Sequence, residues 1–124
     1  MGEDWQALGE LPIVGDVRCA GLMAAIELVR DRTTKASFPD GLRVPWRIRS
    51  AALRRGVIVR ASADTVVVCP PLIITPAQID LIAQVLRESI AEVSAELAAT
   101  AELEPPAAMP ASIAPITLPL PGIA

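Results

Sequence analysis

A capping motif followed by a regular apolar stripe marks one long helix in the second half of the sequence. Thr75, Pro76 and Gln78 supply a capping side chain, a first-turn proline and a glutamine at the third helical position. Apolar residues then recur at steps of three and four for about five turns, which places them on one face. They are Ile79, Ile82, Leu86, Ile90, Val93 and Leu97. We therefore predict a helix from Pro76 to about Ala99 that buries this stripe.

Short extended segments precede this helix and offer a surface for it to pack on. Two are predicted over residues 14–18 and 21–29, the second with a buried face of alternating aliphatic side chains. Two more, over residues 57–60 and 65–69, flank a turn and form a hairpin or neighbouring strands. The Pro-Pro pair at residues 70–71 ends the last strand because proline has no amide proton.

A shorter helix is predicted over residues 45–55. Pro45 suits its first turn, and Gly56 is placed to end it. Its apolar face comprises Val44, Ile48, Ala51 and Ala52. The acidic residues Glu88, Glu92 and Glu96 line another face of the long helix, and we interpret them as solvated surface. The order of elements predicts an α+β fold, a small antiparallel or mixed sheet with helices packed on one face.

The chain has the size of one domain. With 124 residues, 52% hydrophobic but only 2% aromatic, it can build a single modest core from small aliphatic side chains. Regular patterning begins at Leu11, so we expect residues 1–10 to be a lead-in and residues 11–99 to form the domain. Six prolines fall in the last twenty residues. This composition predicts a disordered Pro/Ala-rich tail over residues 100–124.

Charge and hydropathy exclude several classes of partner. The formal net charge is −3, and the basic residues of the first half are interleaved with acidic ones. Aromatic residues that could stack on bases are almost absent, so we expect no nucleic-acid partner. No apolar run is long enough to span a bilayer, and the N-terminus lacks the pattern of a secretory signal. We expect no membrane partner and a cytoplasmic location.

The residues needed for common active sites are missing. The chain has no histidine, so the usual hydrolase triads and most metal sites cannot be assembled. Lys35 is the only lysine and lies in a polar loop, which makes a Schiff-base role improbable on sequence grounds. Cys19 and Cys69 are too few and too far apart for a zinc site, and we interpret them as buried free thiols. We predict no catalytic and no metal-binding residue in this chain.

Two long motifs nevertheless resemble a known family. They read L-P-I-V-G-D-V-R-C-A-G-L-M-A-A-I-E-L-V-R-D from Leu11 and R-R-G-V-I-V-R-A-S-A-D-T-V-V-V-C-P-P-L-I-I-T from Arg54. Together with the helix that follows, they are similar to the C-terminal small domain of class III aminotransferases, most of all to the omega-amino acid or amine:pyruvate subgroup. The resemblance implies a dimeric, pyridoxal-phosphate-dependent enzyme of fold type I that moves an amino group from an amine or amino acid to an oxo acid.

The resemblance gives Arg60 a role in substrate binding. An arginine at the matching place in that subgroup pairs with the substrate carboxylate, and a planar guanidinium does so through two parallel hydrogen bonds. Relatives with ornithine-like substrates place this arginine at the position of Val67. Without the surrounding motifs, Arg60 would be interpreted as a solvated arginine at a strand end.

Two departures from the family limit what the chain can do. Cys19 stands where the family usually has glycine, which puts close backbone packing there in doubt. The large domain, with its Schiff-base lysine, is absent from this sequence. We therefore expect pyridoxal 5'-phosphate to serve the full-length family but not to bind this chain alone, and we expect the partner to be the large domain or a homodimer partner.

Three interpretations of function remain open at this point. The first is a C-terminal fragment of an omega-type transaminase that is inactive alone. The second is the small-domain subunit of a split transaminase, which should expose an apolar docking surface. The third is a non-enzymatic interaction module that kept the fold.

Overall fold

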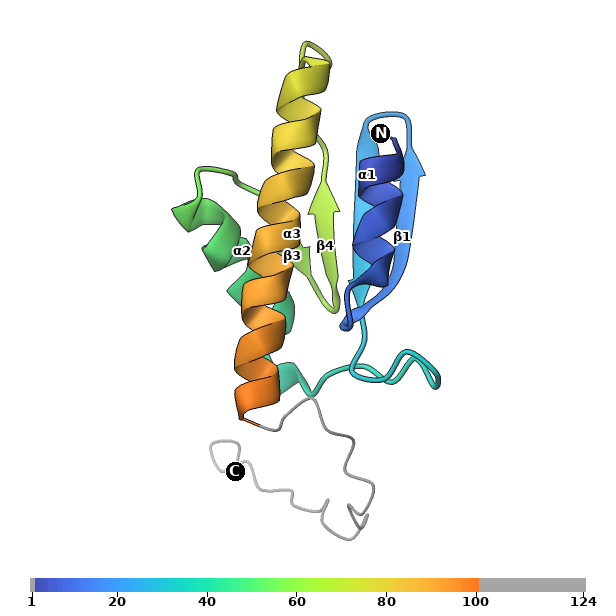
Figure 1. The fold of residues 1–124 in the computed structure, drawn as a ribbon, viewed down its shortest axis with the longest axis vertical. Helices are drawn as coiled ribbons and strands as arrows, with labels where there is room; N and C mark the ends of the chain where they lie inside the picture. Colours follow the sequence, from blue (N-terminus) through green and yellow to red (C-terminus); the bar gives the residue numbers. More distant parts are fainter. Residues whose placement is uncertain (1, 101–124) are drawn as a thin grey trace, which may run out of the picture.

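The computed structural model describes residues 2–100, which form a four-stranded antiparallel sheet covered by helices on one face (Figure 1). The strands are β1 (Val14–Ala20), β2 (Met23–Leu28), β3 (Arg60–Ser62) and β4 (Thr65–Val68), in the spatial order β1-β2-β4-β3. The helices are α1 (Glu3–Gln6), α2 (Val44–Arg54) and α3 (Pro76–Ala99), with 3-10 turns η1 (Ala7–Glu10) and η2 (Asp40–Leu42). The predicted α+β fold is confirmed. The predicted tail over residues 100–124 lies outside the described residues, except for Thr100.

The long helix matches its prediction closely. The hydroxyl of Thr75 accepts a hydrogen bond from the amide of Gln78 at 3.2 Å, and the side-chain oxygen of Gln78 accepts one from the amide of Thr75 at 3.0 Å. This reciprocal pair satisfies two donors that a helix start otherwise leaves open. The stripe packs on the sheet, and its most buried residues are Leu86, Ile90, Val93 and Leu97. The helix stripe is thus one side of the core.

The strand that contains Arg60 is shorter than predicted. We expected strand over residues 57–60, but β3 begins at Arg60 and continues to Ser62. Its pairing with β4 starts at the Arg60–Val67 pair; in the same register Val59 would face Val68, Ile58 would face Cys69 and Val57 would face Pro70. Pro70 has no amide proton, so the ladder could not extend as far as Val57. Residues 57–59 belong to no strand, and the amide of Val57 donates instead to the carbonyl of Ala52 at 3.0 Å.

The N-terminal segment is part of the core, so the expectation that the ordered core starts at Leu11 is wrong. Trp5 in α1 and Leu8 in η1 are fully buried, and both belong to the hydrophobic core cluster. In Figure 1, α1 lies over β1 and β2 on the same face of the sheet as α3. Two short helical turns hold only two large apolar residues, which is too few for a periodic signal in the sequence.

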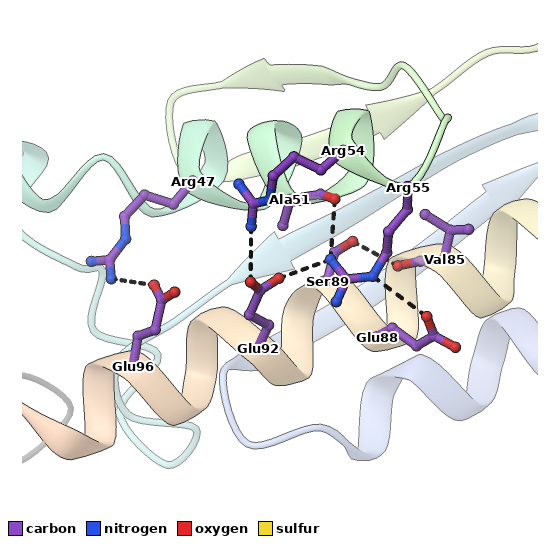
Figure 2. Close-up of polar contacts among 9 residues, drawn as sticks. All are labelled: Arg47, Ala51, Arg54, Arg55, Val85, Glu88, Ser89, Glu92 and Glu96. Atoms are coloured by element: carbon purple, nitrogen blue, oxygen red, sulfur yellow. Dashed lines mark hydrogen bonds and ion pairs between the residues drawn. The ribbon is translucent and has the colours of Figure 1, made fainter.

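Ion pairs join α2 to α3, so the acidic face of α3 is not simply solvated surface (Figure 2). Both carboxylate oxygens of Glu92 accept hydrogen bonds at 2.8 Å, one from Arg54 and one from Arg55. One turn away, Arg47 donates to Glu96 at 2.8 Å. The interhelical ladder formed by Arg47, Arg54, Arg55, Glu88, Glu92 and Glu96 also includes the Arg55–Glu88 pair at 3.4 Å. It fixes how α2 lies against α3.

Opposite charges perturb the ladder residues in the expected directions. The hydrogen bond from Arg55 is the main cause that lowers the pKa of the Glu92 carboxyl, and the charge of Arg54 adds to it. The hydrogen bond to Glu92 likewise raises the pKa of the Arg55 guanidinium. Each group stabilises the charged form of its partner.

Candidate functional site

The sheet face opposite the helices presents a row of side chains that crosses all four strands. Arg18 pairs with Ala25, Ala25 with Val67, and Val67 with Arg60. Directly paired residues of antiparallel strands point to the same side of the sheet. This cross-strand row therefore has an arginine at each end, about 14 Å apart at three strand spacings, and small aliphatic side chains between them.

Arg18 is neutralised by its neighbours on this face. Its guanidinium donates to Asp16 at 2.8 Å and to Glu27 at 3.2 Å. The hydrogen bond to Glu27 is the largest cause that raises the pKa of Arg18 above its ordinary value, and the hydrogen bond to Asp16 is the second largest. Two carboxylates thus surround one arginine, which leaves this end of the row without a cation for an external ligand.

Arg60 is different, because its side chain is exposed and its guanidinium has no hydrogen-bond or ion-pair partner among residues 2–100. It starts β3, which is one of the two edge strands of the sheet. An unpaired guanidinium on an open face can bind a carboxylate through two parallel hydrogen bonds. The structure places the predicted residue on the exposed face, with its charge available.

The hairpin that holds Arg60 is anchored at its turn. Ala63 adopts a left-handed conformation with φ 47°. Asp64 accepts hydrogen bonds from the hydroxyls of Ser37 and Thr65, each at 3.2 Å. Its backbone carbonyl accepts one from the amide of Leu28 at 2.8 Å. Asp64 thus ties the β3–β4 turn to the end of β2 and to the loop that follows it.

Lys35 does not fit a cofactor-binding role. Its Nζ donates to the backbone oxygen of Gly15 at 2.6 Å, so the only amine side chain of the chain is engaged with β1. A pyridoxal-phosphate enzyme needs a lysine amine that can form a Schiff base with the cofactor. Lys35, held on β1, is therefore not placed to form that Schiff base. Within residues 2–100, no cluster of three or more histidine, cysteine or acidic side chains could hold a metal ion.

The two cysteines differ from the sequence interpretation. Cys19 is half-buried and Cys69 is exposed, so the expectation of two buried thiols is wrong. Cys19 pairs with Ala24 and packs against the core. The tight turn falls at Gly21, whose φ of 62° favours glycine.

No helix within residues 2–100 is long and apolar enough to cross a membrane.

The motifs and the fold agree with one enzyme family. The profile of Aminotransferase class-III matches residues 3–90. The chain belongs to the class III aminotransferases. The match includes α1, which is consistent with the buried N-terminal segment.

Individual relatives cover this chain well, but they are much longer. The chain is 38% identical over 95 residues to putrescine–pyruvate aminotransferase of Pseudomonas aeruginosa, covering 77% of this chain and 21% of that protein. It is 44% identical over 88 residues to adenosylmethionine-8-amino-7-oxononanoate aminotransferase of Geobacter sulfurreducens, covering 71% and 19%. A crystal structure of a PLP-bound aminotransferase mutant from Vibrio fluvialis superimposes with a TM-score of 0.72 at 35% identity, covering 74% and 20%. The chain thus spans about a fifth of the length of the relatives it matches.

Proposed function

We propose that this chain supplies the C-terminal small domain of a transaminase that moves an amino group from an omega-amino acid or amine to an oxo acid such as pyruvate. The observation that supports it most is the free, exposed Arg60 in a chain of this family. The Pseudomonas relative is named for an amine donor and pyruvate. The chain alone is expected to be inactive, since Lys35 does not fit the cofactor.

Arg60 binds the substrate carboxylate in this proposal. Its guanidinium supplies two parallel N–H donors, and its long stem lets it turn aside when the substrate is an amine without a carboxylate. Arg18, at the other end of the cross-strand row, cannot take this role because Asp16 and Glu27 already bind it. The open sheet face leaves Arg60 room to reach a ligand.

The remainder of the enzyme supplies the cofactor site. Pyridoxal phosphate, when bound there, holds the amino group while it passes between the two substrates. We further propose that the enzyme works as a dimer, as the family resemblance implies. We also propose a cytoplasmic location without a nucleic-acid or membrane partner, because the charge pattern and composition of the sequence favour neither partner. The part of the enzyme with the cofactor site either belongs to the same polypeptide as these residues or is a separate subunit that binds them. An interaction module without chemistry remains the alternative if no such remainder exists.

A chimera tests this proposal. Residues 3–99 would replace the matching region of the Pseudomonas putrescine–pyruvate aminotransferase, and the half-reactions with carboxylate-bearing and carboxylate-free donors would be measured separately. Arg60→Ala should lower kcat/KM for carboxylate substrates by roughly 10- to 100-fold, the range for a lost charge-assisted hydrogen bond. Carboxylate-free amines should lose little. Arg18→Ala is the matched control, and equal loss on both substrate classes would contradict the role of Arg60.

The isolated chain provides a second test. It should neither acquire a cofactor absorbance band nor transaminate when mixed with pyridoxal phosphate, an amine and pyruvate. Turnover by the isolated chain would refute the proposal. To separate a fragment from a split enzyme, the neighbouring reading frame would be expressed with this chain, and activity only in the mixture would establish the split form.

A further inference from the structure

An apolar groove lies where β4 leads into α3. It has a volume of about 620 Å³ and is bordered by the unpaired segment before β3, the loop after β4 and the first turns of α3. Its lining includes Ile58, Cys69, Pro71, Ile73 and Leu81. We call it the β4–α3 groove.

Large aliphatic side chains around this groove are exposed to solvent. Ile58 is 77% exposed, Ile73 is 88% exposed and Leu81 is 53% exposed. Leu72, the neighbour of Ile73 in the same loop, is also 88% exposed. Single exposed aliphatic residues are ordinary, but a contiguous group around a groove marks an interaction surface. Residues 2–100 leave this surface uncovered.

The loop that presents these side chains is held in place. Pro70 and Pro71 restrict φ at two consecutive positions. The amide of Ile74 donates to the carbonyl of Pro71 at 3.1 Å, which closes a turn, and Thr75 then caps α3. Docking against such a surface orders few additional groups, which favours binding. The exposure of Leu72 and Ile73 is therefore built into the fold.

The groove is continuous with the face that presents Arg60. Ile58 and Arg60 are both exposed and Val59 between them is buried. This alternation puts the side chains of Ile58 and Arg60 on the same side of the chain. A body that covers Ile58 consequently lies next to Arg60.

We infer that the β4–α3 groove is the docking surface for the part of the transaminase that contains the active site. This inference rests on the proposed function, because Arg60 can bind a substrate only if the active site lies against it. The matched region is about a fifth of the length of the relatives, so outside that region they contain a body of the required size.

A matched pair of leucines tests the docking surface. Leu81 borders the groove and Leu53 on α2 does not, yet both are 53% exposed. Leu81→Gln and Leu53→Gln would be made in the full 124-residue chain and in the Pseudomonas chimera without cofactor. Both should leave the melting temperature of the chain alone nearly unchanged. In the chimera, Leu81→Gln should lower it by about 3 °C or more, while Leu53→Gln should not.

Cys69 provides a second readout that does not depend on a destabilising variant. It borders the groove and is exposed, so N-ethylmaleimide should label it readily in the isolated chain. In the chimera the rate of Cys69 labelling, followed by mass spectrometry, should fall at least roughly 10-fold, because a thiol covered by an interface reacts only when that interface opens. If the chimera does not fold, the chain would be co-expressed with the Pseudomonas protein lacking the matching region, and Cys69 labelling would be measured in that pair.

Several outcomes would overturn the inference. Equal effects of Leu81→Gln and Leu53→Gln in the chimera, or unchanged labelling of Cys69, would show that the groove stays open. Failure of both the chimera and the co-expressed pair to assemble would also contradict it. A further outcome is that the isolated chain forms a dimer, that Leu81→Gln abolishes this dimer, and that Cys69 stays reactive in the chimera. This result would overturn the inference and assign the groove to a second copy of the chain. Arg60→Ala should leave Cys69 protection unchanged, so the proposed function can fail independently.

Discussion

Arg60 on β3 and Val67 on β4 are directly opposite each other in the antiparallel ladder, and both side chains lie on the exposed face of the sheet. The family resemblance implies that relatives with ornithine-like substrates have their carboxylate-binding arginine at the position of Val67. The two alternative positions are therefore cross-strand neighbours, separated by one strand spacing of about 4.8 Å. Exchange between them would move the guanidinium sideways without turning it to the other face.

This pairing predicts a measurable repulsion. Val67→Arg beside Arg60 places two like charges opposite each other, which should destabilise the fold by roughly 0.2–1 kcal/mol beyond the effect of the substitution itself. The double variant Arg60→Val with Val67→Arg should lose that penalty. Urea unfolding of the wild type, both single variants and the double variant gives the coupling energy from a double-mutant cycle. A coupling of zero would mean that the two side chains do not face each other.

The interhelical ladder predicts a loss of stability at acid pH. The pKa of Glu92 is lowered from an ordinary value of 4.5 by Arg55 and Arg54, so the unfolded state takes up its proton first as the pH falls. Ionised Glu92 therefore stabilises the fold above about pH 4.5, and this contribution disappears as the pH falls through the folded pKa. Glu92→Gln should lower the melting temperature at pH 7, and this effect should shrink progressively as the pH falls below 4.5.

Glu88→Gln is the matched control for the ladder, because Glu88 makes one longer contact with Arg55 at 3.4 Å whereas Glu92 makes two at 2.8 Å. Its effect at pH 7 should be smaller. High salt should reduce both effects, since the groups are partly exposed and screened. If the two variants gave the same pH profile, the geometry of the Glu92 contacts would not explain the stability.

The start of α3 predicts a defined cost for loss of its cap. Thr75→Ala removes the acceptor for the amide of Gln78 and should cost about 1 kcal/mol of unfolding free energy, while Thr75→Ser keeps it. Urea unfolding measures both. Thr75 lies between α3 and the loop after β4. Thr75→Ala should therefore also speed hydrogen exchange at the amides of Ile73 and Ile74. An unchanged stability for Thr75→Ala would indicate that water replaces the cap without loss.

The elements with strong local signals were predictable from the sequence, and those fixed by pairing or tertiary contact were not. Thr75 and the apolar stripe defined α3 to the residue at its start. The bounds of β3 depended on its pairing with β4, which local sequence does not give. The acidic face of α3 gave no sign of its partners, because the arginines of α2 face it only after the two helices pack.

The candidate site was predictable in part. Arg60 was singled out through the motifs around it; the structure shows that it is exposed, and its role in substrate binding stays a prediction. The neutralisation of Arg18 was not foreseen, because Glu27 meets it only through the β1–β2 pairing. The anchoring of Asp64 by Ser37 also depends on a contact between residues far apart in the sequence. Side chains that act through such contacts leave no local pattern.

Trp5 predicts that the N-terminal segment is essential to the fold. The side chain is fully buried, so Trp5→Ala should cost about 3–5 kcal/mol of unfolding free energy. Trp5→Phe should cost less, because the buried Nε1 of Trp5 has no hydrogen-bond partner within residues 2–100 and its removal relieves a penalty of about 1–3 kcal/mol. Deletion of residues 1–10 should be at least as damaging as Trp5→Ala, since Leu8 is lost too. Asp4→Asn, on the exposed side of α1, is the control, and urea unfolding distinguishes the four proteins. Wild-type stability in the deletion would restore the view of this segment as a lead-in.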